Sequence, residues 1–312
     1  MHTASSPSAR SEVTENAPRR VVVGSDGSHW GQNALVWAAE HAWRTGAELD
    51  VWLWNRTGDT PDDIPDNGGM NHVTSTFPLL SVSIHGAGTD PVHDLKAAAR
   101  GAGLLVIGYR GHSASSSGLD GAVLPLINEI VCDTVVVRGR PASVHGANLR
   151  ITALISGGED DTNVLSRAAA IALEHRSRLR VVHALPAPAT RDALAADHQF
   201  VLDHAARRLE KLDRRPSHTV VLLHGQPHEA VSRCTDSDLV VVGAGDHLAR
   251  TGHCGSVTRS ALHHAPCPVL VVHGPSSSPQ QPEAHPHVPS TRAATGRHDI
   301  SAPADRPARA SV

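Results

Sequence analysis

Aromatic residues are scarce in this chain, and their scarcity limits how a core can be built. They make up 3% of the 312 residues, so any core must be packed mainly from Val, Leu, Ile and Ala. That composition suits a parallel β-sheet covered by alanine-rich helices. A chain of this length forms one or two domains, each large enough to bury its own core.

Cysteine is also scarce, which bears on disulfides and metal sites. The four cysteines form no CxxC pair, and in a reducing compartment we expect them to be free thiols. One local group of histidines and cysteines follows no structural zinc spacing, so no metal site is expected. That group is His253, Cys254, His263, His264 and Cys267.

Long apolar runs and strong charge imbalance are absent as well. No apolar run approaches the roughly 18 residues that a membrane-spanning helix needs. Residues 1–18 are polar and lack the apolar centre of a signal peptide, so a cytoplasmic location is expected. The net charge is −3 and the charges are spread along the chain, so neither a nucleic acid nor a membrane is an expected partner.

The most informative stretch is a loop rich in Gly and Ser between Gly108 and Val123. An apolar run at 104–107 precedes it, as in a buried parallel strand, and residues 124–131 can continue as a helix. A glycine loop that enters a helix N-terminus suits a phosphate group, because the backbone can approach an anion and free N–H groups point at it. The same loop can equally be a simple turn.

A second copy of this pattern raises the significance of the first. Residues 239–242 form another apolar run, followed by Gly243, Gly245 and then Gly255-Ser256. The ends of the copies also match, since 132–137 and 266–272 both read as a short strand after Cys or Pro-Cys. The spacing between copies is that of a whole domain, which indicates a duplicated domain and not a solenoid repeat.

These motifs together resemble the ATP-binding universal stress proteins. The spacing Gly108-x2-Gly111-x9-Gly121 is similar to the nucleotide-binding pattern of that family. The first strand and turn (21–28) and the last helix and strand (261–272) are similar too. The resemblance covers residues 19–140 and 148–273 in tandem. It implies an α/β fold of two doubly wound, flavodoxin-like (HUP-like) domains, each with a five-stranded parallel sheet.

The resemblance also implies a nucleotide site in the first domain. Asp26, at the carboxyl end of the first strand, would accept hydrogen bonds from a ribose or adenine group, although it could merely cap the next helix. Gly108 and Gly111 would wrap the ribose and phosphates, and Gly121 would open the helix at the phosphates; the alternative is a turn that needs positive φ. The complete predicted site is Ser25, Asp26, Gly27, Trp54, Gly108, Arg110, Gly111, His112, Gly121, Ala122 and Val123.

Both copies depart from the family pattern. After the last glycine the family has Ser or Thr, and here Ala122 removes a hydroxyl whose bond to a phosphate is worth about 1.5–3 kcal/mol. Serines in the same loop could substitute, or could be solvated. In the second copy the position matched to Asp26 is Gly157, and Asp246 stands near the expected phosphates. We therefore predict a degenerate second site at Gly157, Gly243, Gly245, Gly255 and Ser256.

The order of elements is the same in both copies, with one exception. Residues 1–18 and 274–312 are predicted to be disordered tails, and 141–147 a linker. In the second copy 190–212 is a convincing helix, whereas the corresponding stretch 55–78 shows no helical period. The first copy is therefore expected to have a long loop there, acting as a lid or left by sequence decay.

Three functions remain open at this stage. The leading one is a cytoplasmic stress-response regulator that binds ATP, with Mg²⁺, in the first domain and changes its protein partners accordingly. The second is a scaffold of the same fold that binds no nucleotide. The third is a slow ATPase, although no catalytic apparatus is visible and the Walker lysine motif is absent, so we expect no enzyme. Tandem members of the family resemble a fused dimer joined through the last strands, here 134–138 and 269–273.

Overall fold

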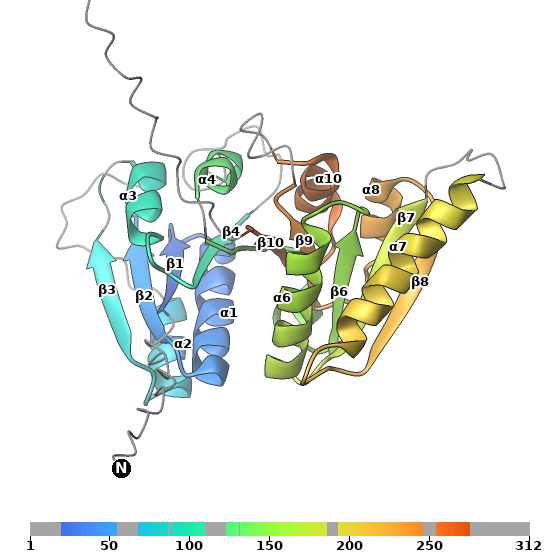
Figure 1. Cartoon of the computed structure of the whole chain (residues 1–312). Coiled ribbons are helices and arrows are strands. Elements are labelled where there is room, and N and C mark those ends of the chain that lie inside the picture. Colours follow the sequence, from blue (N-terminus) through green and yellow to red (C-terminus); the bar gives the residue numbers. More distant parts are fainter. Residues whose placement is uncertain are drawn as a thin grey trace, which may run out of the picture. The chain divides into compact units, whose positions relative to one another are not determined.

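A single β-sheet runs through the part of the chain that the computed structural model describes. That part comprises residues 20–54, 68–86, 88, 90–109, 123–130, 132–185, 193–245 and 254–274, with side chains from 198 onward in the seventh segment. It lies within the first of two compact units, residues 1–276. Among these residues, ten strands form the sheet in the order β3-β2-β1-β4-β5-β10-β9-β6-β7-β8 (Figure 1).

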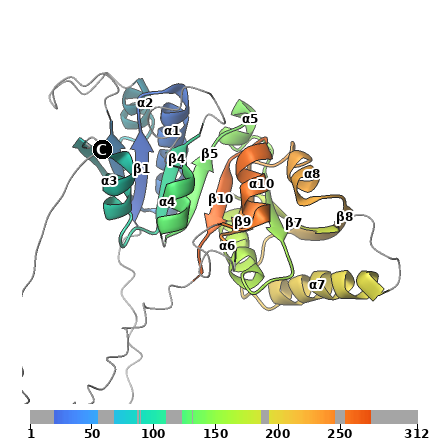
Figure 2. The same ribbon diagram turned by 90° about the horizontal axis from the view of Figure 1, so that it is seen from above.

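The first half of the sheet is a parallel β/α arrangement. Its elements are β1 (Arg20–Ser25), α1 (His29–Thr45), β2 (Glu48–Leu53), α2 (Gly68–Thr76), β3 (Val82–Gly86), α3 (Pro91–Ala98), β4 (Leu104–Gly108), α4 (Val123–Glu129) and β5 (Thr134–Val137). Helices α1 and α2 cover one face, and α3 and α4 cover the other (Figure 2). Such two-sided cover makes this half doubly wound.

The second half repeats this order after a short helix, α5 (Pro141–Val144). Its elements are β6 (Arg150–Ile155), α6 (Asp161–Glu174), β7 (Arg178–Leu185), α7 (Ala193–Glu210), β8 (His218–His224), α8 (Pro227–Ser232), β9 (Leu239–Gly243), α10 (Ser256–His264) and β10 (Val269–Val272). Helices α6 and α7 lie on one face, with α8 and α10 on the other (Figure 2). The predicted α/β fold class is confirmed.

Local sequence explains where the first helix begins and ends. Ser28 has extended backbone, and its hydroxyl accepts a hydrogen bond from the backbone N–H of Gly31 at 3.1 Å, so it is the N-cap of α1. Gly46 ends the helix with a φ of 67°, a left-handed conformation that glycine adopts without strain. Between these caps the alanine-rich face of α1 is buried against the sheet.

The expected absence of a helix between the second and third strands is wrong. Residues 68–76 form α2, which packs on α1: Val73 is fully buried, and a Cβ at Gly69 would lie 3.2 Å from the Leu35 side chain. Because α2 is short and mostly polar, two buried positions leave no visible helical period, and tertiary packing decides its conformation. The remainder of the predicted loop, 55–67, lies outside the described residues.

The two halves are joined by the pairing of their last strands, as predicted. Strands β5 and β10 run antiparallel, with Val136 opposite Val269 and Thr134 opposite Val271. The predicted linker 141–147 is partly helical, because α5 lies there and buries Val144 at 3% exposure. The linker thus adds to the core instead of only connecting the halves.

Polar contacts from both sides reinforce this seam. The guanidinium of Arg138 donates to the carbonyl of His263 at 3.1 Å, and the imidazole of His273 lies 3.1 Å from the carbonyl of Ile127. Arg138 follows β5 and His273 follows β10, so each half contacts the helix before the other half's last strand.

Candidate functional site

Three neighbouring strands of the first half end at the predicted site. In the register of the sheet, Gly24 of β1 lies opposite Ile107 of β4 and Ser25 opposite Leu53 of β2. Asp26, Trp54 and Gly108 therefore lie at the same carboxyl edge, and the N–H of Trp54 donates to the carbonyl of Ser25 at 3.0 Å. Ligands of open α/β sheets bind in the crevice at such an edge.

Asp26 is 9% exposed and has one carboxylate oxygen engaged. Its Oδ1 accepts a hydrogen bond from the N–H of Ser28 at 3.1 Å, which forms an Asx turn before the helix; the cap of α1 is Ser28 and not Asp26. Its Oδ2 makes no hydrogen bond to the described residues. Gly27 turns the chain with a φ of 71°, and the absent side chain of Gly31 makes room, since a Cβ there would lie 2.9 Å from Oδ1. Within the described part of the chain, one oxygen is thus left for a ligand.

The glycine at position 108 has a packing reason. A Cβ at Gly108 would lie 2.4 Å from the carbonyl oxygen of Trp30 and 2.9 Å from the N–H nitrogen of Gly31. The first turn of α1 therefore approaches β4 so closely that only glycine fits. Gly108 is not among the glycines with positive φ, so the turn alternative does not explain it.

The other predicted residues of this site are buried or lie outside the described part. Trp54 is 6% exposed, and its indole Nε1 is buried without a hydrogen-bond partner among the described residues. Val123, which begins α4, is 2% exposed. Arg110, Gly111, His112, Gly121 and Ala122 lie outside the described residues, as does Asp246 of the second half.

The strand registers correct the match between the two halves. Ile151 of β6 lies opposite Leu239 of β9, as Val21 of β1 lies opposite Leu104 of β4. Counting along the strands from these pairs places Ser156, not Gly157, at the position of Asp26. Gly157 instead corresponds to Gly27, and both have positive φ, 89° and 71°. The sequence match was offset by one residue because the serine before each turn was aligned.

The second half has carboxylates of its own at the equivalent edge. Oδ1 of Asp161 accepts from the N–H of Ser156 at 3.0 Å, and its Oδ2 accepts from the N–H of Gly157 at 2.7 Å. Burial raises the pKa of Asp161, while these backbone hydrogen bonds oppose the shift. The carboxylate of Asp160 accepts from the N–H of Gly245 at 2.9 Å. N–H groups available to an anion are therefore already used.

Sequence reasoning missed these two aspartates. Asp161 occupies the helix position that corresponds to Gly31 in the first half, by the same strand register. The available signal was the pair of acidic residues at the start of a helix, where carboxylates accept from backbone N–H groups. The negative charge near the expected phosphates thus comes from Asp160 and Asp161 within the described residues.

A histidine pair lies at the same edge of the second half. The imidazole of His183 has Nδ1 at 2.9 Å from the carbonyl of Ile155 and Nε2 at 2.6 Å from Nδ1 of His198. The side chain of Val201 also lies 3.2 Å from where a Cβ of Gly157 would be. Side chains of α7 and β7 therefore lie where the second half's crevice is expected.

Four residues of the predicted second site lie where β9 ends and α10 begins: Gly243, Gly245, Gly255 and Ser256. The N–H of Gly255 donates to the carbonyl of Ala244 at 3.0 Å, and a Cβ at Gly245 would lie 2.9 Å from the Gly255 nitrogen. Gly243 is packed against Asp160, because a Cβ at Gly243 would lie 3.0 Å from the Asp160 Cβ. Ser256 is the first residue of α10 and is exposed. Gly245 and Gly255 are thus in contact, whereas Gly157 lies apart, at the turn after β6.

Neither metal ligation nor thiol chemistry has support in the described residues. No group of three or more His, Cys, Asp or Glu side chains there could hold a metal ion. Burial raises the pKa of the Cys132, Cys234 and Cys267 thiols, which keeps them protonated and unreactive. His253 of the zinc group considered above lies outside the described residues.

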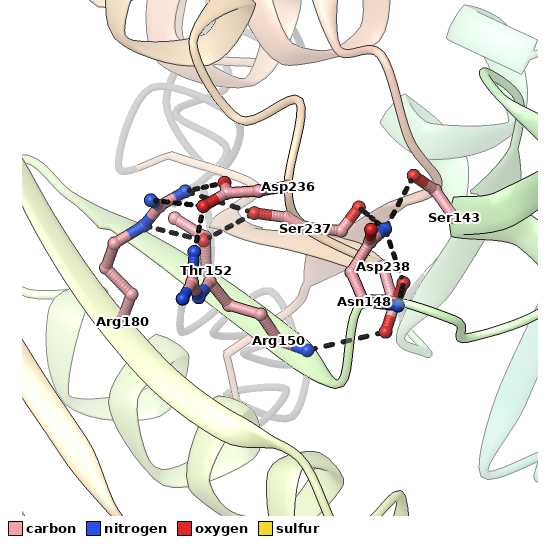
Figure 3. A network of polar contacts seen from close by, with 8 residues as sticks. All are labelled: Ser143, Asn148, Arg150, Thr152, Arg180, Asp236, Ser237 and Asp238. Atoms are coloured by element: carbon pink, nitrogen blue, oxygen red, sulfur yellow. Dashed lines mark hydrogen bonds and ion pairs between the residues drawn. The ribbon is translucent and has the colours of Figure 1, made fainter.

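A dense polar network occupies the opposite, amino edge of the second half (Figure 3). Arg150 and Arg180 both pair with the carboxylate of Asp236, and the hydroxyls of Thr152 and Ser237 lie 2.8 Å apart. Since each of these groups has a partner within the network, it stabilises strand ends and does not form a binding site. Its members are Ser143, Asn148, Arg150, Thr152, Arg180, Asp236, Ser237 and Asp238.

The length and composition of the helices indicate whether any of them could cross a membrane. Among the described residues, no helix combines the length and the apolar character needed to cross a membrane.

Comparisons with known proteins agree on the fold. Residues 148–273 match the model of the universal stress protein family. A universal stress protein from Archaeoglobus fulgidus is 15% identical, with a TM-score of 0.55 over 81% of this chain and 96% of its own. A putative universal stress protein from Pseudomonas aeruginosa is 17% identical, with a TM-score of 0.56 over 82% of this chain and 94% of its own.

The same fold occurs outside stress proteins. The cytoplasmic domain of a prokaryotic cation chloride cotransporter is 12% identical, with a TM-score of 0.53 over 81% of this chain and 95% of its own. No curated protein matches the chain in sequence. The fold therefore leaves the function to be argued from the site.

Proposed function

We propose that the chain is a stress-response protein with two universal-stress-protein halves, of which the first binds an adenine nucleotide. The family match of residues 148–273 supports the stress-related role. The observation that carries the nucleotide proposal is Oδ2 of Asp26, which no described residue engages, at the carboxyl edge beside the close approach of α1 to Gly108. A carboxylate at this edge suits the hydroxyls of a ribose or the amino group of adenine.

The second half supports the proposal by contrast. Its edge has the same topology, but Asp160 and Asp161 accept the hydrogen bonds of Gly245, Ser156 and Gly157. A triphosphate would meet two carboxylates there instead of free N–H groups, and like charges repel. One nucleotide per chain is therefore expected, in the form of ATP with Mg²⁺ as the counterion of its phosphates.

In this proposal the chain is an internal pseudo-dimer. The antiparallel pairing of β5 with β10 supports this arrangement, because it joins the last strands of the two halves. Nucleotide occupancy in the first half would alter the surface offered to protein partners, without turnover of the nucleotide.

A scaffold that binds no nucleotide is the second candidate. Two observations favour it: Ala122 lacks the hydroxyl expected at a phosphate, and the second half's N–H groups are already satisfied. A slow ATPase is a third candidate, supported by no assembled catalytic group among the described residues.

Calorimetric titration with Mg-ATP tests the proposal. Asp26→Asn keeps an oxygen that can cap Ser28 but removes the charge, and it should weaken binding about ten- to a hundredfold. The matched control is Asp161→Asn in the second half, which should leave the affinity unchanged. Binding by the unaltered chain with equal affinity in Asp26→Asn would contradict the proposed site. No binding at millimolar ATP would favour the scaffold, and phosphate release that requires Asp26 would favour the ATPase.

A further inference from the structure

Besides the sheet seam, a pair of histidines links the two halves. His41 lies on α1 and His175 at the C-cap of α6, and Nδ1 of His41 is 3.2 Å from Nε2 of His175. His41 is 3% exposed. This contact joins residues of different halves on the face of the sheet that α1 and α6 share.

Trp37 encloses the pair from one side. Its ring stacks on that of His41 with centroids 5.3 Å apart and an interplanar angle of 15°, and it is tilted against His175 at 6.0 Å. The indole is 5% exposed. Burial of His41 and Trp37 keeps water from much of this contact, so added charge there is poorly solvated.

Several charged or titratable groups line the cavities beside this pair or lie close to it. Burial, then Arg44 and Arg167, lower the pKa of His175 to about 4. Two cavities flank the pair, one lined by His41 and one by His175, and acidic groups line both. The groups are Glu40 and Arg44 on α1, Arg167 and Glu174 on α6, Arg20, Asp133 and His273 at the first cavity, Asp238 at the second, and His145 near Glu40.

We propose that the His41–His175 pair is an acid-sensitive contact that holds the two halves together. The hydrogen bond between the rings requires one unprotonated nitrogen at the contact. Protonation of both rings removes that acceptor and places two cations 3.2 Å apart. Burial, then Arg44 and Arg167, oppose a proton on His175, so acid weakens the link between α1 and α6.

The direction in which stability changes with pH follows from the lowered pKa of His175. Its pKa is about 4 in the folded chain and about 6.5 in the unfolded chain. The pair's full contribution is therefore present above pH 6.5, and it is lost as the pH falls from 6.5 through 4. Within this window the equilibrium constant for opening should rise by up to about tenfold per pH unit, since one proton is taken up.

Urea unfolding of the full chain between pH 4 and 7.5 tests this inference. His175→Gln retains hydrogen-bonding groups but does not titrate, so the loss of stability between pH 6.5 and 4 should become shallower by up to one proton. His228→Gln is the matched control, because His228 is exposed and its ring neighbours His264 at 6.0 Å. An equal pH dependence in the original chain and in His175→Gln would overturn the proposal.

Hydrogen exchange provides a second measurement if a variant fails to fold. In the original chain, peptides from α1 and the end of α6 should exchange faster as the pH falls from 6.5 to 4.5, after correction for the intrinsic rate, while β9 should remain protected. Unchanged protection of α1 and α6 over this range would equally overturn the proposal. Because neither measurement involves a nucleotide, failure here is distinct from failure of the proposed function.

Discussion

The two halves place a carboxylate at the carboxyl edge of the sheet in different ways. In the first half it belongs to the strand-end residue Asp26, and the helix has Gly31 beside it. In the second half the strand end has Ser156, and the helix has Asp161. Asp26 keeps one oxygen that no described residue engages, whereas Asp161 uses both of its oxygens on backbone N–H groups. The position of the carboxylate, on the strand end or on the helix, thus decides whether one of its oxygens stays without a described hydrogen-bond partner.

The two halves also differ in the polar contacts of their carboxylates at the amino edge of the sheet. A substitution there should have the largest effect on the free energy of unfolding. Asp238 is 4% exposed and accepts from the N–H and side-chain amide of Asn148, at 2.9 and 2.8 Å. Asp238→Ala removes two hydrogen bonds to a buried carboxylate, each worth about 1.5–3 kcal/mol, and should lower the free energy of unfolding by about 3–5 kcal/mol.

A buried carboxylate of the first half, Asp50, provides the comparison for that prediction. Asp50 pairs with Arg20 at 3.0 Å, but the arginine side chain is 35% exposed. Asp50→Ala should cost roughly 1–2 kcal/mol, because water can solvate the freed guanidinium. Urea unfolding of both variants at neutral pH measures the difference, and equal losses would contradict it.

Alanine substitutions of Gly108 and Gly243, the last residues of β4 and β9, compare how closely the two halves pack at these strand ends. Gly108→Ala places a methyl group 2.4 Å from the Trp30 carbonyl, and the backbone must move, at a cost of about 2–3 kcal/mol. In Gly243→Ala the nearest atom is a side-chain carbon of Asp160 at 3.0 Å, so the cost should be about 1 kcal/mol. Thermal unfolding of the two variants should rank them in this order; the reverse ranking would show that the first turn of α1 can shift freely.

Removing the carboxylate of Asp161 tests whether that group alone prevents a nucleotide from binding at the carboxyl edge of the second half. Asp161→Ala deprives the N–H groups of Ser156 and Gly157 of their acceptor, and should cost about 1–2 kcal/mol of stability. No second nucleotide should bind, because His183 and His198 remain. Calorimetric titration with Mg-ATP gives the stoichiometry, and two nucleotides per chain would show that Asp161 was the only obstacle.

The smallest expected effect concerns how the two first helices are capped. Ser28 caps α1 through its hydroxyl, so Ser28→Ala should cost about 1 kcal/mol. The N-cap of α6, Asp160, makes no such side-chain bond. Gly158→Ala, two residues before Asp160, is therefore a control substitution near a helix start that removes no cap. Urea midpoints of the two variants measure the difference, and no loss in Ser28→Ala would show that water replaces the cap.

The layered α/β fold and, except for α2, the order of its elements could be predicted from the amino-acid sequence, whereas the pairing of the last strands was implied by the family resemblance. Continuous apolar runs such as 104–107, bounded by glycines, are typical of a parallel strand buried on both faces. The N-cap at Ser28 and the helix end at Gly46 are local features of the same kind, because both depend on the neighbouring backbone alone.

Features that depend on contacts between distant residues became visible only in the folded chain. Helix α2 exists because Val73 packs on α1, although its own sequence has little helical pattern. Ser156 was identified as the counterpart of Asp26 by strand register, which a one-residue alignment shift conceals. The meeting of His41 with His175 likewise follows from the antiparallel pairing of β5 and β10. In each case the deciding partner is far along the chain, where local propensity carries no information.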